Sequence, residues 1–205
     1  MNATVPSRSA LLDLRDERRS LGEGHAFLDE KCLVLAAEML RQSAKCRELR
    51  EAVRGAADVA SSRLAAAASR HGLEALACLP PGVACDTLAW TSRPVMGVEV
   101  LASTFVRDAS PDAMPGQSSP EARECALAFR ELVAAAAALA GASTSLERLA
   151  REYRRTIRRA RAVGEVLLPA ADRDVAGMEA QLEDLEREEA IQMKLGAVSP
   201  AGARK

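Results

Sequence analysis

Residues 11–53 decide the fold class, and they read LLDLRDERRSLGEGHAFLDEKCLVLAAEMLRQSAKCRELREAV. A leucine recurs at every seventh position, interrupted only by Gln42, in the row Leu14, Leu21, Leu28, Leu35 and Leu49. A second row, offset by three or four residues, holds Leu11, Arg18, His25, Cys32, Met39, Cys46 and Val53. Two rows at heptad spacing form a helical stripe that packs against another helix in a left-handed coiled coil.

A matching stripe occupies the C-terminal half of the chain. Its members are Leu132, Leu139, Leu146, Leu149, Tyr153, Thr156, Ala160, Val163 and Leu167. After Pro169 the apolar row continues in a different phase, as Val175, Met178, Leu182 and Leu185. Because proline removes a backbone donor and crowds the preceding turn, we expect a kink near Pro169 that absorbs the phase change.

Proline also marks the boundaries between segments. Six of the nine prolines fall between Pro80 and Pro120. The sequence therefore predicts a mainly α chain, a long antiparallel two-helix coiled coil with a short β-hairpin and a loop in the middle. The expected segments are an N-terminal tail (1–8), a first long helix (9–79), a middle segment (80–119), a second long helix (120–196) and a C-terminal tail (197–205).

The middle segment differs in composition from both helices. Residues 83–106, VACDTLAWTSRPVMGVEVLASTFV, contain Val98, Val100 and Ala102 in alternation with polar or small neighbours. We predict a β-hairpin there with a turn signal at Ser92–Arg93–Pro94. Residues 108–119 are expected to form a loop.

The helix pairing carries a register. If the two termini meet at one end of the coiled coil, the numbers of paired residues sum to about 200. The expected neighbours are then Leu14 and Glu186, Leu28 and Asp172, and Leu49 and Arg151.

Composition narrows the function classes. The 205 residues include 42 alanines but only five aromatic residues, which is typical of long helices rather than of a compact core. A net charge of −1 argues against a dedicated nucleic-acid-binding protein. No run of 18 apolar residues occurs, so we expect no membrane span. The first 19 residues lack the apolar core of a signal peptide, which predicts a cytosolic chain.

Candidate catalytic chemistry is sparse. The five cysteines form no CxxC pair and are expected to be buried thiols. His25 has no second histidine within helical reach, and no phosphate loop, nucleophile elbow or HExxH motif occurs. We therefore predict no catalytic residue, no cofactor and no metal site.

Charge is distributed unevenly along the second helix. Seven arginines and two glutamates lie between Glu147 and Arg161, whereas nine acidic residues and two arginines lie between Glu165 and Glu189. These stretches are either solvated faces or successive levels that contact different protein partners.

Three separated strings resemble the D subunit of V-type and archaeal-type ATPases. Residues 6–35, PSRSALLDLRDERRSLGEGHAFLDEKCLVL, are similar to the family's P-T-R-x-x-L-L-x-L-K start and its G-H-x-L-L-K-x-K-R continuation. Residues 93–100, RPVMGVEV, resemble its N-V-M-G-V-x-V hairpin. Residues 153–196 resemble its K-T-R-R-R-V-N-A-L-E-x-V-x-I-P-R-L block and its E-R-E-x-F-F-R-L-K ending. Departures such as Cys32 and Ala190–Ile191 suggest a divergent bacterial member.

The resemblance implies a central-stalk (rotor axle) subunit of a V/A-type rotary ATPase or ATP synthase. Such a chain is non-catalytic and transmits torque between ATP turnover in a hexamer of A and B subunits and proton or sodium translocation in the membrane ring. Its implied partners are the A and B subunits, the F subunit and the subunit that caps the membrane ring. Its implied location is cytoplasmic, peripheral to the inner membrane.

The resemblance also suggests roles for residues. Contacts in the bore of the hexamer are expected from Arg8, Arg15, Arg18, Arg19, Glu186, Arg187 and Lys194. A hairpin that projects sideways near the base of the hexamer is expected at Val95, Met96, Gly97 and Val98, and partner contacts on the shaft are expected from Arg154, Arg155, Arg158 and Arg159. The predicted coiled-coil core is Leu14, Leu21, Leu28, Leu35, Leu49, Leu146, Tyr153, Leu182 and Leu185.

Two other classes stay open. A coiled-coil stalk or adaptor of another export ATPase would share the paired helices but would need no β segment. In a homodimeric scaffold, the stripe of the first helix would pair between two chains. An enzyme would need a catalytic constellation that the sequence does not offer.

Overall fold

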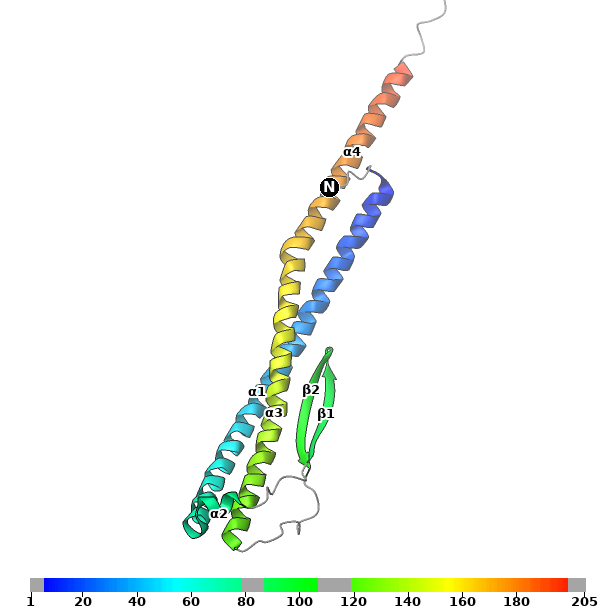
Figure 1. The fold of residues 1–205 in the computed structure, drawn as a ribbon. Helices are drawn as coiled ribbons and strands as arrows, with labels where there is room; N and C mark the ends of the chain where they lie inside the picture. Colours follow the sequence, from blue (N-terminus) through cyan, green and yellow to red (C-terminus); the bar gives the residue numbers. More distant parts are fainter. Residues whose placement is uncertain (1–5, 79–86, 107–118, 199–205) are drawn as a thin grey trace, which may run out of the picture. The chain divides into compact units, whose positions relative to one another are not determined.

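The computed structural model describes residues 6–78, 87–106 and 119–198. The elements are α1 (Arg8–His71), α2 (Leu73–Ala77), β1 (Thr87–Val95), β2 (Val98–Val106), α3 (Pro120–Ala162), the π-helical turn η1 (Val163–Leu167) and α4 (Leu168–Val198) (Figure 1). The predicted fold class, a mainly helical chain with a β-hairpin in its middle, is confirmed. The chain forms two compact units, unit 1 (residues 1–32 and 155–205) and unit 2 (residues 33–154), which are described one at a time.

Capping residues set the ends of the long helices. Ser7 caps α1, because its Oγ accepts the backbone N–H of Ala10 at 3.2 Å. The helix ends where Gly72 takes a φ of 76°, a left-handed conformation that suits glycine. The helix expected over 9–79 is therefore interrupted at Gly72 and continues as the separate α2. Ser119 caps α3 in the same way as Ser7, and Pro120 occupies the first helical position, where no N–H is needed.

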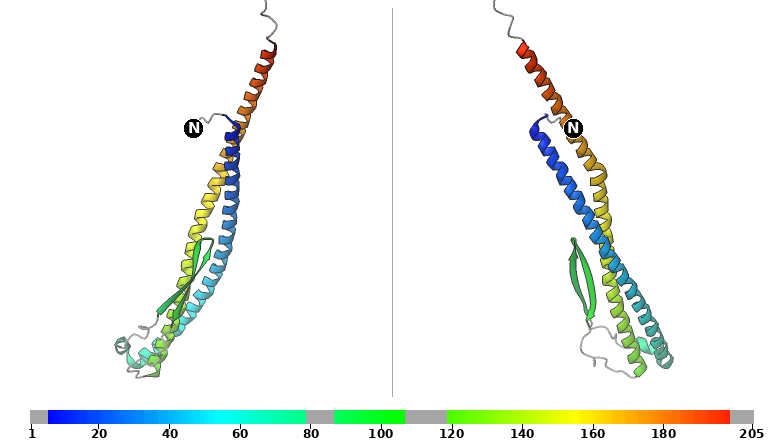
Figure 2. Two further views of the ribbon diagram at one scale, coloured as in Figure 1. Left: turned by 90° about the vertical axis from the view of Figure 1, so that its right-hand side faces the viewer. Right: turned by 180° about the vertical axis from the view of Figure 1, so that it is seen from behind.

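In unit 1 the beginning of α1 runs antiparallel to α4 (Figures 1 and 2). Arg8 pairs with Glu186 and Arg18 pairs with Asp172, so the residue numbers sum to 194 and 190. The predicted register near 200 is wrong, since Asp172 lies beside Arg18 rather than Leu28. The reason is that α4 continues to Val198, beyond the level of Glu186, where α1 begins.

A π-helical turn, η1, lies just before Pro169, where the sequence predicts a kink. The backbone N–H of Leu168 bonds to the carbonyl of Val163, five residues earlier, and Pro169 follows directly. A π-helical turn holds one more residue than an α-helical turn. It therefore shifts the phase of the apolar stripe just before the proline.

In unit 2 the antiparallel strands β1 and β2 lie beside α1 and α3 (Figures 1 and 2). Their register runs from Thr87↔Val106 to Val95↔Val98. The turn is formed by Met96 (φ 47°) and Gly97 (φ 82°), as a two-residue hairpin requires. The predicted turn at Ser92–Arg93–Pro94 is wrong, because these residues continue β1. Residues 83–86 of the predicted hairpin and nearly all of the predicted loop lie outside the described residues.

Candidate functional site

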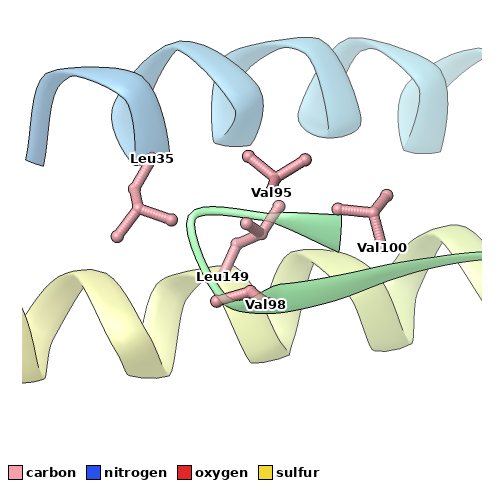
Figure 3. Close-up of a cluster of buried hydrophobic side chains, with 5 residues drawn as sticks. All are labelled: Leu35, Val95, Val98, Val100 and Leu149. Carbon is pink, nitrogen blue, oxygen red and sulfur yellow. The ribbon is translucent and has the colours of Figure 1, made fainter. Parts of the chain in front are cut away.

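The turn end of the hairpin packs inward within unit 2. Val95 and Val98 are both 8% exposed and form a buried cluster with Val100, with Leu35 of α1 and with Leu149 of α3 (Figure 3). Met96 packs against this cluster, and Gly97 is exposed. We expected the residues around this turn to project sideways, but the structure buries both valines because they share one apolar face with Val100.

The exposed part of the hairpin is its open end. Trp90, the single tryptophan of the chain, is 55% exposed, and Leu88 and Val106 are exposed as well. A large aromatic side chain on the surface of a chain with five aromatic residues is notable, because such side chains often anchor protein interfaces.

Small residues of α3 let the backbone of β2 approach closely. The backbone N–H of Leu101 donates to Ser145 Oγ at 2.7 Å, and Ser103 Oγ donates to the carbonyl of Ala137. A Cβ atom on Gly141 would lie 2.9 Å from the backbone nitrogen of Ser103, closer than real Cβ atoms come. Gly141 and Ser145, one turn apart, therefore form a flat surface on which β2 rests.

A buried carboxylate holds β1 to α1. The side chain of Glu38 is 1% exposed, and its Oε1 accepts Nη2 of Arg93 and Nε2 of Gln42, both at 2.9 Å. Its Oε2 accepts two nitrogens of Arg41, with Nε at 2.9 Å. Burial by itself would raise the pKa of Glu38, but the hydrogen bonds from Gln42, Arg41 and Arg93 outweigh it and hold the pKa below its ordinary value.

Sequence reasoning missed these positions. Glu38, Gly141 and Ser145 carry no recognised motif, and together with Leu35 and Leu149 they form what we call the hairpin seat. A signal was present for Glu38, because Gln42 occupies a leucine position of the first heptad row and lies one helical turn after Glu38. Two polar residues one turn apart on an apolar stripe indicate a buried polar contact.

Unit 1 places most of the predicted bore residues in contacts within the chain. Arg8 bonds to Glu186 at 2.8 Å, Arg15 bonds to Glu179 at 2.6 Å, and Arg18 bonds to Asp172. We call these three pairs the ion-pair ladder. Arg187 pairs with Glu183 and Asp184 along α4. The remaining predicted bore residues, Arg19 and Lys194, are exposed.

The predicted shaft arginines are exposed, whereas most of the predicted coiled-coil core residues are buried or half-buried. The four predicted shaft arginines are exposed on α3, and Nε of Arg154 donates to the carbonyl of Ala150 at 3.1 Å. Leu35 is fully buried, whereas Leu185 is 41% exposed near the level at which α1 begins. The other predicted core residues are half-buried: Leu14, Leu21, Leu28, Leu49, Leu146, Tyr153 and Leu182.

The described residues offer little catalytic chemistry. No group of three His, Cys, Asp or Glu side chains in residues 6–78, 87–106 and 119–198 could hold a metal ion. Cys46 and Cys125 are buried, and burial raises the pKa of the Cys125 thiol, which favours an inert thiol. Cys78 is exposed, contrary to the expectation of buried thiols, and Cys85 lies outside the described residues.

One helical stretch, Pro120–Leu195, is apolar enough by length and composition alone to cross a membrane. Its most apolar 18-residue window has a mean hydropathy of 1.6 and is 22% buried. Charged residues interrupt the alanines of this stretch, so it contains no unbroken run of 18 apolar residues. An alanine-rich helix that packs closely against a neighbour has the same composition, and here Ala137 and Gly141 lie against β2.

Comparisons with known proteins match almost the whole chain. A family model of the ATP synthase D subunit covers residues 10–196. The chain belongs to this family of ATP synthase D subunits. The V-type ATP synthase D subunit of Anaeromyxobacter dehalogenans (strain 2CP-1) is 30% identical over 95% of this chain and 95% of its own length. The V-type D subunit of Thermus thermophilus is 29% identical over 95% and 87%. The A-type D subunit of Methanopyrus kandleri is 30% identical over 92% and 83%.

Membership of this family agrees with the geometry. The family model spans both long helical stretches and the hairpin between them. The chain is one component of an ATP synthase and works in a complex with other subunits.

Proposed function

We propose that this chain is the non-catalytic central-stalk subunit of a V/A-type ATP synthase. It transmits torque between ATP hydrolysis or synthesis in the A/B hexamer and proton or sodium translocation in the membrane ring. The observation that carries the proposal is the family match over residues 10–196 of a chain built from paired long helices. Its partners are the A and B subunits, the F subunit and the subunit that caps the ring, and it lies in the cytoplasm at the inner membrane.

Unit 1 supplies the part that enters the bore of the hexamer. The ion-pair ladder supports this role, because it cross-links α1 to α4 where a shaft must resist splaying. Contacts to the hexamer then fall mainly to exposed side chains outside the ladder, including Arg19 and Lys194. A rotating contact meets a different face of the hexamer at each step, so no single ion pair can be essential.

Unit 2 supplies the lateral contact. The exposed open end of the hairpin, with Leu88 and Trp90, is the part that reaches the base of the hexamer, because the turn end is packed on the seat. The exposed arginines at 154, 155, 158 and 159 supply partner contacts on the shaft. A homodimer through α1 is disfavoured, since the apolar stripe of α1 is already covered within one chain by α3 and the hairpin in unit 2.

The test is a pull-down of the tagged chain from its native cells, followed by mass spectrometry. We expect A, B and F subunits in one assembly, with one copy of this chain per hexamer. A bead attached to this chain in the immobilised hexamer should rotate when ATP is added, and the isolated chain should hydrolyse no ATP. Recovery of the chain by itself, or a bead that stays still on an ATP-hydrolysing complex, would reject the axle role.

A further inference from the structure

The hairpin is joined to α1 by a charge that is almost completely buried. Glu38 is 1% exposed, whereas its partner Arg93 is 62% exposed and lies over it. A buried carboxylate costs several kcal/mol unless charged and polar donors surround it. Glu38 meets this demand with four hydrogen bonds to its two oxygens.

The donors to Glu38 are of two kinds. Arg41 and Gln42 lie three and four positions after Glu38 on α1, so their hydrogen bonds form whenever that helix forms. Arg93 belongs to β1 and is 55 positions away in sequence. The bond from Arg93 therefore exists only when the hairpin rests on its seat, and it distinguishes a seated hairpin from a detached one.

The hairpin seat holds the strands by non-directional apolar contacts and by a directional contact to each strand. Val95, Val98 and Val100 contact Leu35 and Leu149 through apolar surfaces, which have no preferred direction and allow sliding. Ser145 fixes β2 against α3 through the backbone of Leu101. The charge-assisted bond between Arg93 and Glu38 supplies the corresponding directional contact between β1 and α1.

We propose that Glu38 is a positioning residue for the hairpin. Through Arg93 it fixes the height and tilt of β1 along α1, and so it determines how the open end at Leu88 and Trp90 is presented. The proposal rests on the function proposed above only for the consequence of this positioning, which is efficient coupling in the assembled complex.

Hydrogen exchange at one backbone amide shows whether the hairpin is packed against α3. The amide of Leu101 is bonded to Ser145 of α3, so its hydrogen exchange is slowed only while the hairpin is seated. The amides of Val98 and Val100 face β1 and report whether the hairpin itself is formed. Exchange measured on the full chain by NMR or mass spectrometry therefore separates loss of seating from loss of folding.

The decisive variant is Glu38→Gln, and Glu51→Gln is its matched control. Glu51 lies on the same helix and also binds an arginine three positions later, but its side chain is 68% exposed and its ion pair stays within α1. We expect exchange at the Leu101 amide to become about 10-fold faster in Glu38→Gln, as loss of a charged hydrogen bond implies. Exchange within α1 should stay unchanged, and Glu51→Gln should behave as the wild type. Equal exchange at Leu101 in all three proteins would overturn the proposal.

A second variant covers the case in which Glu38→Gln also disturbs α1. Arg93→Met leaves every residue of α1 intact and should speed Leu101 exchange by a similar factor, and the double variant should add little. An unaltered Leu101 amide in Arg93→Met would show that Glu38 acts only within α1 and would overturn the proposal.

In the assembled complex, the number of ions pumped per ATP hydrolysed can be measured separately from the stability of this chain. In the assembled ATPase, Glu38→Gln should lower ATP-driven ion pumping per ATP hydrolysed while the amount of assembled complex stays the same. If Leu101 exchange becomes faster but pumping per ATP is unchanged, the positioning role of Glu38 is supported. The proposed contact between the open end of the hairpin and the hexamer is then contradicted. The two proposals therefore fail separately.

Discussion

The ion-pair ladder of unit 1 and the hairpin seat of unit 2 hold their elements together by different means. In unit 1, α1 is tied to α4 by arginine–carboxylate pairs whose side chains are 41–84% exposed. In unit 2, α1 and α3 also share exposed pairs, Arg63–Glu124 and Arg70–Glu121. Around the hairpin, however, the contacts are a closed apolar cluster and a carboxylate that is 1% exposed. Water and salt weaken an exposed pair, whereas burial strengthens each contact and makes an unpaired group costly. Substitutions should therefore have large effects at the hairpin seat and small effects in the ion-pair ladder.

The largest difference is expected from leucine truncation. Leu149→Ala removes a fully buried side chain from the cluster under the hairpin and should lower the free energy of unfolding by about 2–5 kcal/mol. Leu185→Ala in unit 1 removes a side chain that is 41% exposed and should change it by less than about 1 kcal/mol. Urea unfolding followed by circular dichroism measures both. Equal losses would mean that unit 1 has a core as closed as that of unit 2.

Substitution of one glycine in each unit, Gly141 in unit 2 and Gly164 in unit 1, tests the same difference. A Cβ on Gly141 would meet the backbone nitrogen of Ser103 at 2.9 Å, so Gly141→Ala must shift β2 and should cost about 1–3 kcal/mol. A Cβ on Gly164 would meet Nε2 of His25, the far end of a side chain that can rotate away, so Gly164→Ala should be nearly neutral.

The control for both variants is Gly55→Ala, where the new methyl group meets open space and should stabilise α1 by up to about 1 kcal/mol. Thermal unfolding of the three variants tests the order Gly55, Gly164, Gly141 from most to least stable. A Gly141 variant as stable as the Gly55 variant would contradict the close approach of β2 to α3.

Acid should weaken the buried link. The folded chain holds the pKa of Glu38 below its ordinary value of 4.5, because the hydrogen bonds from Gln42, Arg41 and Arg93 outweigh the opposing effect of burial. A depressed pKa adds stability that is complete above the unfolded value and is lost as the pH falls through the folded value. The difference in unfolding free energy between wild type and Glu38→Gln should be constant from about pH 8 to 6 and shrink below about pH 4.5. Urea titrations across this range measure it, and a difference that persists undiminished at about pH 3 would contradict the assignment.

The smallest effect is expected in the ion-pair ladder. Arg15→Met breaks an exposed pair with Glu179 and should lower the melting temperature by no more than about 2–4 °C at low salt. The shift should disappear in about 0.5 M NaCl, where exposed charges are screened. Melting curves at the two salt concentrations provide the test. A larger shift that survives high salt would place the ladder in the same class as the buried link.

The sequence was a reliable guide to the periodic parts of the molecule. The members of the two rows of α1 are buried or half-buried, with Leu35 and Cys46 buried, and Arg18 is the one exposed member. The hairpin turn was misplaced because Arg93–Pro94 resembles a turn signal, whereas the turn needed the positive φ that Met96 and Gly97 adopt. The family resemblance indicates the bore residues, but a one-dimensional pattern does not show that Arg8 and Arg15 bind carboxylates of α4 within the chain.

Local periodicity and composition by themselves determined the long helices, the apolar stripe and the place of the hairpin in the chain, and the resemblance of three separated strings indicated the family. These features follow from interactions between residues a few positions apart, which any window of the sequence displays. The tertiary structure alone decided the register of the helices, the inward packing of the hairpin turn and the burial of Glu38. Each depends on contacts such as Arg93 with Glu38 and Gly141 with Ser103, which join residues tens of positions apart. Their geometry exists only after the helices and the hairpin have packed together.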